Sequence, residues 1–291
     1  MSPTSHRHGS AGDDVADEGD AEDVWTTVER VRWQGTSSTR AFDTVAREEP
    51  LEIRIGGIPL AVLMRTPGHD EDLVRGFLVT EGIVASQRCI ARMSPCTNVD
   101  GEDAEGNVMQ VRLTADSDVD VQHFRRNLYA TSSCGLCGKA TIERVMAIAP
   151  PIDSSIRVRA ETIYTLPDTL RRAQSLFERT GGCHAAGLFD AVGNLSVARE
   201  DIGRHNAVDK TIGWFQNHPH REPPAILLVS GRVSFEIVQK TLAARVPILA
   251  AVSAPSSLAV QLARTARLTL VAFVRGRSLQ VYAGGERVTA G

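Results

Sequence analysis

The segment that decides the fold class is residues 225–274, AILLVSGRVSFEIVQKTLAARVPILAAVSAPSSLAVQLARTARLTLVAFV. Short, continuously apolar runs occur at 225–230, 247–252 and 268–274, and amphipathic stretches separate them. Continuous apolar runs are typical of strands that are buried on both faces, and the stretches between them have the period of helices. The alternation therefore predicts a parallel sheet that is covered on both faces by helices.

The same alternation begins upstream, near residue 160. Pro167 is expected to open a helix that runs to about Arg179, because proline suits the first helical position. Residues 185–198 predict a hairpin, since Gly193-Asn194 lies between two apolar runs. A further helix is expected at 206–215.

The N-terminal half, residues 25 to about 120, has a different pattern that predicts strands with one helix. Two apolar runs flank Gly56-Gly57, which is a hairpin signal. Acidic residues at the start of 70–78 precede an apolar face and suit the positive end of a helix dipole. Polar and apolar residues alternate at 108–113, which predicts another strand.

Three segments follow from these patterns. Residues 1–24 are expected to be a disordered acidic tail, because Asp and Glu crowd there with little to bury. Residues 25–150 are expected to form a smaller strand-rich α+β region that ends in a Cys-x-x-Cys loop and a helix. Residues 151–291 are expected to form an α/β domain of three layers, α/β/α, which the family resemblance described below makes a cofactor-binding domain.

Composition narrows the function classes. The 291 residues carry a formal net charge of −3, which gives no case for nucleic-acid binding. No apolar run is long enough to cross a bilayer and no secretory signal is visible, so a cytoplasmic location is expected. Five cysteines at irregular spacing do not resemble a disulfide framework. Reactive or metal-binding thiols are the better expectation.

The sharpest chemical feature is Cys134-Gly135-Leu136-Cys137. Two thiols three positions apart can share one electrophilic sulfur or close on each other. A helix is expected from about Lys139, and a helix N-terminus lowers the pKa of a nearby thiol. Three interpretations are open: half of a zinc site, a thioredoxin-like dithiol, and a sulfur relay. Spacing alone ranks zinc and redox chemistry above sulfur transfer.

Two histidines are further candidates. His184 lies in 180–187, whose structural alternative is a helix cap and a buried strand with Cys183 as a small apolar residue. His205 lies in the charged segment 199–210, which could instead form a surface ion-pair network. A zinc deaminase would need Glu where Ala186 stands, which disfavours deamination.

Small and basic residues follow the predicted strands. Ser230, Gly231 and Arg232, and likewise Ser256, lie where a strand ends and a helix opens, which favours an anion cradle. Helix capping by serine is an equally weighted alternative. The last clear strand ends in Phe273, Val274, Arg275, Gly276, Arg277 and Ser278. Two arginines around a glycine suit a phosphate or a guanine edge.

These segments together resemble the FdhD family, the sulfur-carrier accessory proteins of formate dehydrogenase. The resemblance runs from about residue 50 almost to the end, and its motifs lie at 133–138, 180–190, 199–210, 228–240 and 248–262. It implies a cytidine-deaminase-like α/β domain with a smaller domain, usually as a homodimer.

The resemblance also implies a chemistry. A cysteine desulfurase would pass sulfur to Cys134, with Cys137 as its partner, and the persulfide would go to the molybdenum of the bis-molybdopterin guanine dinucleotide cofactor before its insertion into formate dehydrogenase. The family's cofactor-binding segment falls on 273–278. No permanent metal, nucleic acid or membrane partner is expected. A zinc-binding protein and a cofactor chaperone without sulfur transfer stay as alternatives to this sulfurtransferase.

Overall fold

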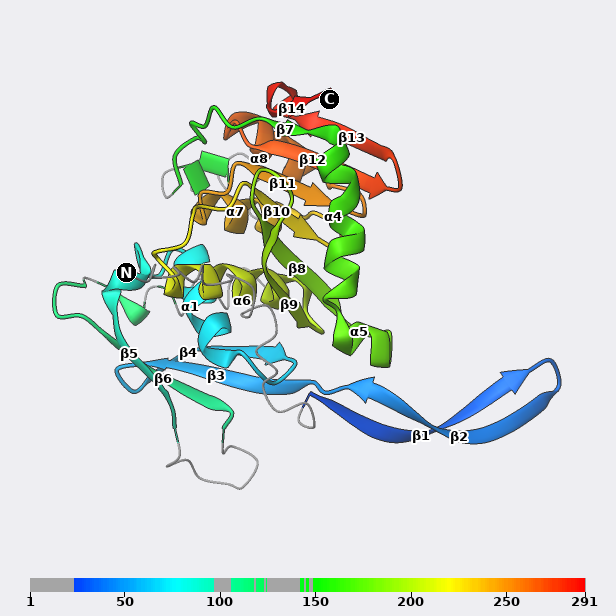
Figure 1. Ribbon diagram of the computed structural model, residues 1–291. Coiled ribbons are helices and arrows are strands. Elements are labelled where there is room, and N and C mark those ends of the chain that lie inside the picture. Colours follow the sequence, from blue (N-terminus) through cyan, green and yellow to red (C-terminus); the bar gives the residue numbers. More distant parts are fainter. Residues whose placement is uncertain are drawn as a thin grey trace, which may run out of the picture.

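The computed structural model describes residues 24–96, 106–117, 119–122, 124, 142–143, 145–146 and 149–290. These residues form a projecting two-stranded arm, a four-stranded sheet and a six-stranded sheet (Figure 1). A pair of helices packed against each other joins the two larger sheets, and the functional residues predicted above lie mainly around the six-stranded sheet.

The six-stranded sheet has the order β13-β12-β11-β10-β8-β9. Its strands are β8 (His184–Phe189), β9 (Leu195–Asp201), β10 (Ile226–Val229), β11 (Ile248–Ala251), β12 (Thr269–Arg275) and β13 (Ser278–Ala283). Only β10, β11 and β12 run parallel, so the prediction of a parallel sheet is correct for its centre and wrong for its flanks. The flanking strands belong to tight hairpins, which only antiparallel neighbours can form.

Helices cover both faces of this sheet, which confirms the three layers. One face packs against α4 (Ala160–Arg172), and the other packs against α6 (Arg204–Asn217), α7 (Phe235–Ala243) and α8 (Ser257–Thr265). Ile226 and Leu228 belong to the core on the α4 side, whereas Leu227 and Val229 belong to the core on the opposite side. A run that is apolar at every position is thus explained by burial on both faces.

The helix predicted to open at Pro167 differs from its prediction. It begins two turns earlier, at Ala160, so Pro167 lies inside α4, and a separate short helix, α5 (Ser175–Thr180), follows. The buried side chains of Ile163, Leu166 and Leu170 span the proline. Their packing outweighs the backbone hydrogen bond that proline removes.

The N-terminal sheet has the order β4-β3-β6-β5. Its strands are β3 (Glu49–Ile55), β4 (Ile58–Arg65), β5 (Ile90–Pro95) and β6 (Val108–Leu113), and its helices are α1 (Asp70–Thr80) and the 3₁₀ turn η1 (Gln87–Cys89). The predicted hairpin at Gly56-Gly57 is confirmed, and both glycines have positive φ. The remaining short elements are β7 (Val158–Arg159), β14 (Val288–Thr289) and η3 (Gly285–Arg287).

Helix α1 packs closely against α6. A β-carbon added to Gly76 would overlap the carbonyl oxygen of Asp209, and one added to Gly213 would overlap that of Asp72. Glycine at both positions therefore allows the two backbones to touch. This contact couples the N-terminal sheet to the three-layer part, although the predicted segment boundaries stay a prediction.

The arm consists of β1 (Trp25–Gln34) and β2 (Ser37–Ala46), paired in antiparallel register. It extends away from the body (Figure 1). Across the described ranges, none of the helices has both the length and the apolar character needed to cross a bilayer.

Candidate functional site

The carboxyl ends of the three parallel strands meet at one edge of the six-stranded sheet. The loop after β10 and the loop after β11 are joined by Val233 N–H to Ala254 O at 3.0 Å and by Ser256 N–H to Val233 O at 2.9 Å. The loop after β11 is joined in turn to the end of β12, where Phe273 N–H donates to Ser253 O at 3.3 Å. The structure thus brings three predicted binding segments side by side.

Phe273 sits at an irregular point of β12. Its φ of 53° lies in the left-handed region, which is costly for an aromatic residue, and the register between β12 and β13 shifts there. The bend directs Arg275 back over the edge, where its Nε donates to Val252 O at 3.2 Å and its guanidinium lies 5.7 Å from the Phe273 ring. The edge therefore gains a cation from β12.

His184 begins β8, which runs antiparallel to β10 and so starts at this same edge. A β-carbon at Gly231 would lie 3.3 Å from His184 Nδ1 and 3.7 Å from the β-carbon of Arg204. Burial lowers the pKa of His184, and the positive charges of Arg204 and Arg232 lower it further. His184 is therefore disposed to be neutral beside two guanidinium groups at neutral pH.

Arg204 carries an unused donor. Its Nε is buried and has no hydrogen-bond partner within the part of the chain that the structure describes. A buried N–H of a charged group is costly when it is unpaired, so its presence favours a ligand that accepts a hydrogen bond there. We call His184, Arg204, Ser230, Gly231, Arg232 and Arg275 the sheet-edge site.

His205 lies next to this group at the start of α6. Its Nε2 is 3.3 Å from Ser234 Oγ. Burial lowers its pKa first, followed by the charges of Arg204 and Lys240. Ser234 precedes α7 without capping it, because no backbone N–H of that helix donates to its hydroxyl. The Ser234 hydroxyl instead lies within hydrogen-bond distance of His205.

The other predicted hydroxyls have structural contacts. Ser256 Oγ accepts the N–H of Ala259 at 3.2 Å and caps α8, as the structural alternative predicted. Ser230 Oγ accepts the N–H of Ala185 at 2.9 Å, and its own proton stays available for donation. Each of these two serines therefore stabilises the backbone at the edge of the sheet and also places a hydroxyl group there.

A cavity of about 550 Å³ opens beside the sheet-edge site. His184, Ser230 and Val252 line it on the sheet side, and α4 and α5 contribute the opposite wall, which includes Arg171. Cys183 also lines it, but burial, followed by the charge of Glu200, raises the pKa of its thiol to about 11. This thiol is protonated at neutral pH, which fits the structural interpretation of Cys183.

The remaining predicted residues lie apart from this cavity. Val274 is fully buried in the core on the α4 side, so only its backbone could contact a ligand. Gly276, with φ of 54°, and Arg277 form the exposed turn that leads to Ser278 in β13. Their part in binding stays a prediction.

The two cysteines of the predicted loop, Cys134 and Cys137, lie outside the described residues. Beyond them, Ile142 and Val145 are buried in the core with α7 and α8, as the apolar pattern of that stretch predicted. Among the residues that can be described, no three His, Cys, Asp or Glu side chains are arranged to hold a metal ion.

In the charged segment 199–210, Asp201 and residues 206–210 are buried and the others are half-buried, so the alternative of a surface network is wrong. Asp201 and Lys210 form an ion pair at 2.8 Å with side-chain exposures of 0% and 1%. Both also bind Thr66, in the turn between β4 and α1: Asp201 Oδ2 accepts its N–H at 3.1 Å, and Lys210 Nζ donates to its O at 2.7 Å. The N–H of Ile202 donates to Thr66 Oγ at 3.1 Å. These residues hold the two halves together.

A second buried pair was not predicted at all. Lys240 of α7 contacts Asp209 of α6 at 2.9 Å, Thr80 Oγ of α1 at 3.0 Å and Glu81 at 2.6 Å. The Thr80 hydroxyl donates to the other Asp209 oxygen at 2.7 Å. Three helices thus meet at one lysine.

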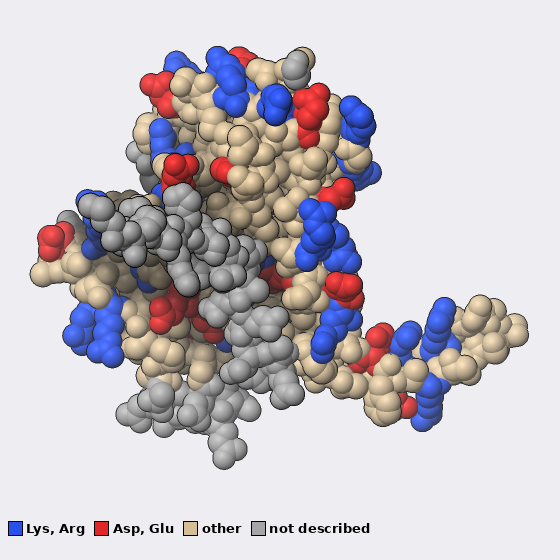
Figure 2. All heavy atoms as spheres, viewed as in Figure 1, with Lys and Arg blue, Asp and Glu red and all other residues tan. Residues whose placement is uncertain are grey.

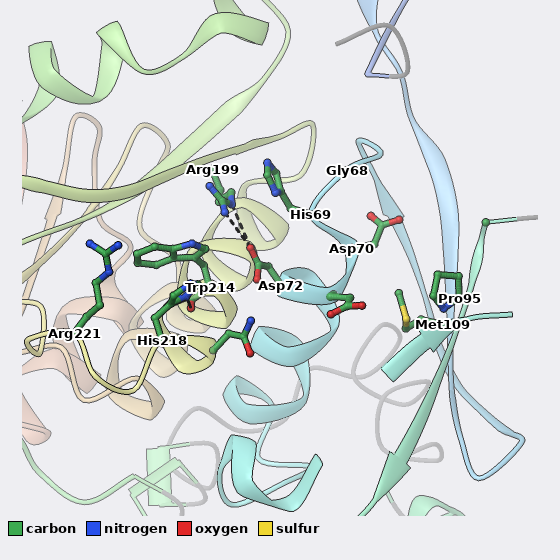
Figure 3. Close-up of a pocket in the computed structure, with 13 residues that line it drawn as sticks. Gly68, His69, Asp70, Asp72, Pro95, Met109, Arg199, Trp214, His218 and Arg221 are labelled. Atoms are coloured by element: carbon green, nitrogen blue, oxygen red, sulfur yellow. Dashed lines mark hydrogen bonds and ion pairs between the residues drawn. The ribbon is translucent and has the colours of Figure 1, made fainter. Parts of the chain in front are cut away.

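Sequence reasoning also missed a hollow of about 730 Å³ between the two halves (Figure 3). Arg199 donates to Asp72 there at 3.1 Å, and the ring of Trp214 stacks on His218 at 4.2 Å. Arg221 lies 5.3 Å from the Trp214 ring. None of the predicted site residues lines this hollow, and the polar groups of Arg199 and Asp72 are already paired with each other.

Comparisons with known proteins agree on one family. The model of the FdhD/NarQ family matches residues 46–289. A protein of Streptomyces coelicolor named sulfur carrier protein FdhD is 51% identical over 267 residues, 90% of this chain and 94% of its own length. A protein of the same name from Mycobacterium tuberculosis is 50% identical over 257 residues, 85% of this chain and 92% of its own length.

A solved structure has the same fold. The crystal structure of a proposed formate dehydrogenase accessory protein from Desulfotalea psychrophila covers 91% of this chain and 100% of its own length, with a TM-score of 0.72 and 22% identity. The likeness to cytidine deaminases stays a prediction. The family match across most of the sequence and the relatives at half identity lead to one conclusion: the chain belongs to the FdhD/NarQ family.

Proposed function

We propose that this chain is a sulfur carrier that accepts sulfur as a persulfide on Cys134 and delivers it to a molybdenum cofactor bound at the sheet-edge site. Relatives that share about half of its residues bear the name of sulfur carrier. The observation that carries the binding part is the buried Nε of Arg204, which has no partner in the described chain.

An anionic nucleotide fits the chemistry of this site. Three guanidinium groups, those of Arg204, Arg232 and Arg275, lie along the edge, where burial and the charges of Arg204 and Arg232 lower the pKa of His184. Nearby carboxylates among the described residues include Asp201 and Glu81, which are paired with Lys210 and Lys240, and Glu236. Phosphate oxygens would accept from the guanidinium groups, and Gly231 leaves room for a close approach. The bis-molybdopterin guanine dinucleotide, as cargo, supplies the metal that receives the sulfur.

The sulfur step requires only thiols. The Cys134 thiolate attacks the terminal sulfur of a desulfurase persulfide, the S–S bond breaks, and the desulfurase cysteine leaves as a thiolate. In delivery, the Cys137 thiolate attacks Cys134 Sγ and displaces the terminal sulfur as sulfide. The two electrons come from the thiolates, which end as a disulfide that a dithiol reductant of the cytoplasm reopens. We propose that the chain works in that compartment.

The first test is intact-mass spectrometry after incubation with a cysteine desulfurase and cysteine. We expect a gain of one sulfur atom that a reductant removes, retained in Cys183→Ser and absent in Cys134→Ala. Tightly held zinc with no sulfur gain would favour the zinc-binding alternative instead.

The second test measures the cofactor-binding part of the proposal. Guanosine diphosphate serves as the probe for the nucleotide end of the cofactor in calorimetry. Arg204→Gln should weaken binding about 10- to 100-fold, which corresponds to about 1.5–3 kcal/mol for a hydrogen bond to a charged group. Arg204→Lys, which keeps the charge, should lose less, and Cys134→Ala should bind normally.

The chaperone alternative makes a different prediction for activity. It requires that formate dehydrogenase stays active when the chain carries Cys134→Ala and fails with Arg204→Gln. Our proposal requires failure in both cases. We also propose three partners for this chain: a cysteine desulfurase, formate dehydrogenase and a second copy of the chain.

A further inference from the structure

The arm, defined as β1 and β2, has one apolar face. In antiparallel pairing, residues opposite each other point to the same side. Trp33 is opposite Ser38, Val31 is opposite Arg40, and Phe42 is opposite Glu29, so the three large apolar side chains share a face. Their exposures are 69% for Trp33, 52% for Val31 and 76% for Phe42. We call these three side chains the arm face.

The described body of the chain covers only the base of this arm. There Arg179 of α5 lies 4.6 Å from the ring of Trp25. Beyond the base the arm extends away from the body (Figure 1). A two-stranded hairpin cannot bury its own apolar face and is marginal in water by itself. The arm face therefore has the character of an interaction surface.

Charge on this side of the arm is already neutralised. Its two charged residues, Glu29 and Arg40, are paired with each other at 3.7 Å. Figure 2 shows a tip without acidic or basic side chains, consistent with the uncharged residues 33–39. A neutral, aromatic surface fits an apolar partner better than a nucleic acid or an acidic peptide.

A second apolar surface is exposed in the part of the chain that the structure describes. Strand β4 is an edge strand, and its side chains of Val62, Met64 and Ile58 have exposures of 54%, 51% and 36%. The arm and β4 together hold eight of the ten large apolar side chains that are exposed among the described residues. We call Ile58, Val62 and Met64 the β4 patch.

We infer that the arm face of one chain packs on the β4 patch of a second copy, and that the second copy's arm returns the contact. This inference rests on the pairing of two chains proposed above and names its surface. It does not depend on sulfur transfer.

The area of contact favours a second copy over an unrelated partner. Strands of this length span about 34 Å, and two strands are about 10 Å wide, so one arm covers roughly 340 Å². Both surfaces are buried in a contact, so one docked arm removes about 700 Å² from water. That is below the roughly 1,000 Å² expected of a stable interface. Reciprocal docking doubles the area to about 1,400 Å² and closes the assembly at two chains.

The test measures the oligomeric state of the full chain by light scattering and sedimentation at micromolar concentration. We expect a dimer for the unaltered chain and a monomer, with at least a 100-fold higher dissociation constant, for Trp33→Ser/Phe42→Ser. The matched control is Val28→Ser/Val45→Ser, which removes two apolar side chains of 38% exposure from the opposite arm face and should stay dimeric.

The acceptor surface is tested separately with Val62→Glu/Met64→Glu, which should also be monomeric. A mixture of the arm variant with this β4 variant keeps one intact arm opposite one intact patch, so weak heterodimers should form although neither variant pairs alone. A β4 variant that stays dimeric, or an unaltered chain that stays monomeric, overturns the inference. Circular dichroism and thermal melting show whether each variant is folded.

Fluorescence adds a readout at the contact itself. On dilution of the unaltered chain through the dissociation constant, Trp33 emission should shift to longer wavelength, and Trp33→Phe should lose that shift. Sulfur loading is measured by intact mass, independently of the oligomeric state. A monomer that still loads sulfur refutes the arm contact alone, whereas a dimer that does not load sulfur refutes the carrier proposal alone.

Discussion

Replacing Lys240 by methionine is expected to destabilise the protein strongly. Lys240 is 3% exposed and donates to Asp209, Thr80 and Glu81, which belong to α6, α1 and the residue that follows α1. Methionine has a similar length but offers no charge and no donor. Asp209, itself 2% exposed, would be left buried without a cation.

The expected loss in the free energy of unfolding is about 3–5 kcal/mol, as found when one partner of a buried ion pair is removed. This is a large share of the roughly 5–15 kcal/mol that holds a typical protein folded. Two controls isolate the cause. Glu81→Gln removes a partly exposed partner and should cost about 1 kcal/mol or less. Asp209→Leu/Lys240→Met removes both charges and should recover most of the loss.

The measurement is urea denaturation of each variant at pH 8 and at pH 5. Burial raises the pKa of Asp209 to about 6, and the Lys240 charge is the main opposing cause. Without Lys240 that pKa rises further above its value in the unfolded chain, so the folded state binds the proton more tightly. The deficit of Lys240→Met should therefore shrink as the pH falls to 5. A loss below about 1 kcal/mol, or an equal deficit at both pH values, would refute this reasoning.

Three further predictions follow from single contacts. Gly231→Ala places a β-carbon 3.3 Å from His184 Nδ1, so the ring must shift to make room. A loss of about 1 kcal/mol in binding free energy should weaken guanosine diphosphate binding about fivefold in calorimetry. Cys183, with a thiol pKa of about 11, should resist iodoacetamide at pH 7 in the native protein and react after unfolding in urea, as read by peptide mass spectrometry; rapid native labelling would contradict its burial. Gly76→Ala should cost more than about 3 kcal/mol or prevent folding, because its β-carbon would overlap the backbone of α6. Gly285→Ala, whose β-carbon would make only an ordinary contact at 3.8 Å from Val281 Cγ1, should leave the melting temperature nearly unchanged.

Local patterns were sufficient where neighbours in sequence are neighbours in space. The hairpins at Gly56-Gly57 and Gly193-Asn194 and the alternation in 225–274 were predicted for this reason. The clustering of the sheet-edge site was also predictable, because parallel strands end at the same edge.

Features that depend on distant residues were beyond such patterns. From the sequence, Asp201 and Lys210 could not be told from surface charges. Their burial depends on Thr66, which lies more than 130 positions away and binds both. The helix across Pro167 depends on packing against the sheet, which outweighs a local breaker. The alternation of apolar and polar residues in β1 and β2 would be the same whether the apolar face packed on the body of the chain or faced solvent. The sequence therefore could not predict that the arm projects from the body.

The bonds of Thr66 also bear on how the chain is made. Its N–H, O and Oγ all bind residues that follow it by 135 to 144 positions. At about 5–20 residues per second, a ribosome adds those positions only about 7 to 29 seconds after Thr66 has been joined to the chain. During that interval the polar groups of Thr66 can hydrogen-bond only to water. The face of α1 that packs on α6 stays uncovered. A nascent N-terminal half is thus exposed to chaperones and proteases until nearly three quarters of the protein has been synthesised.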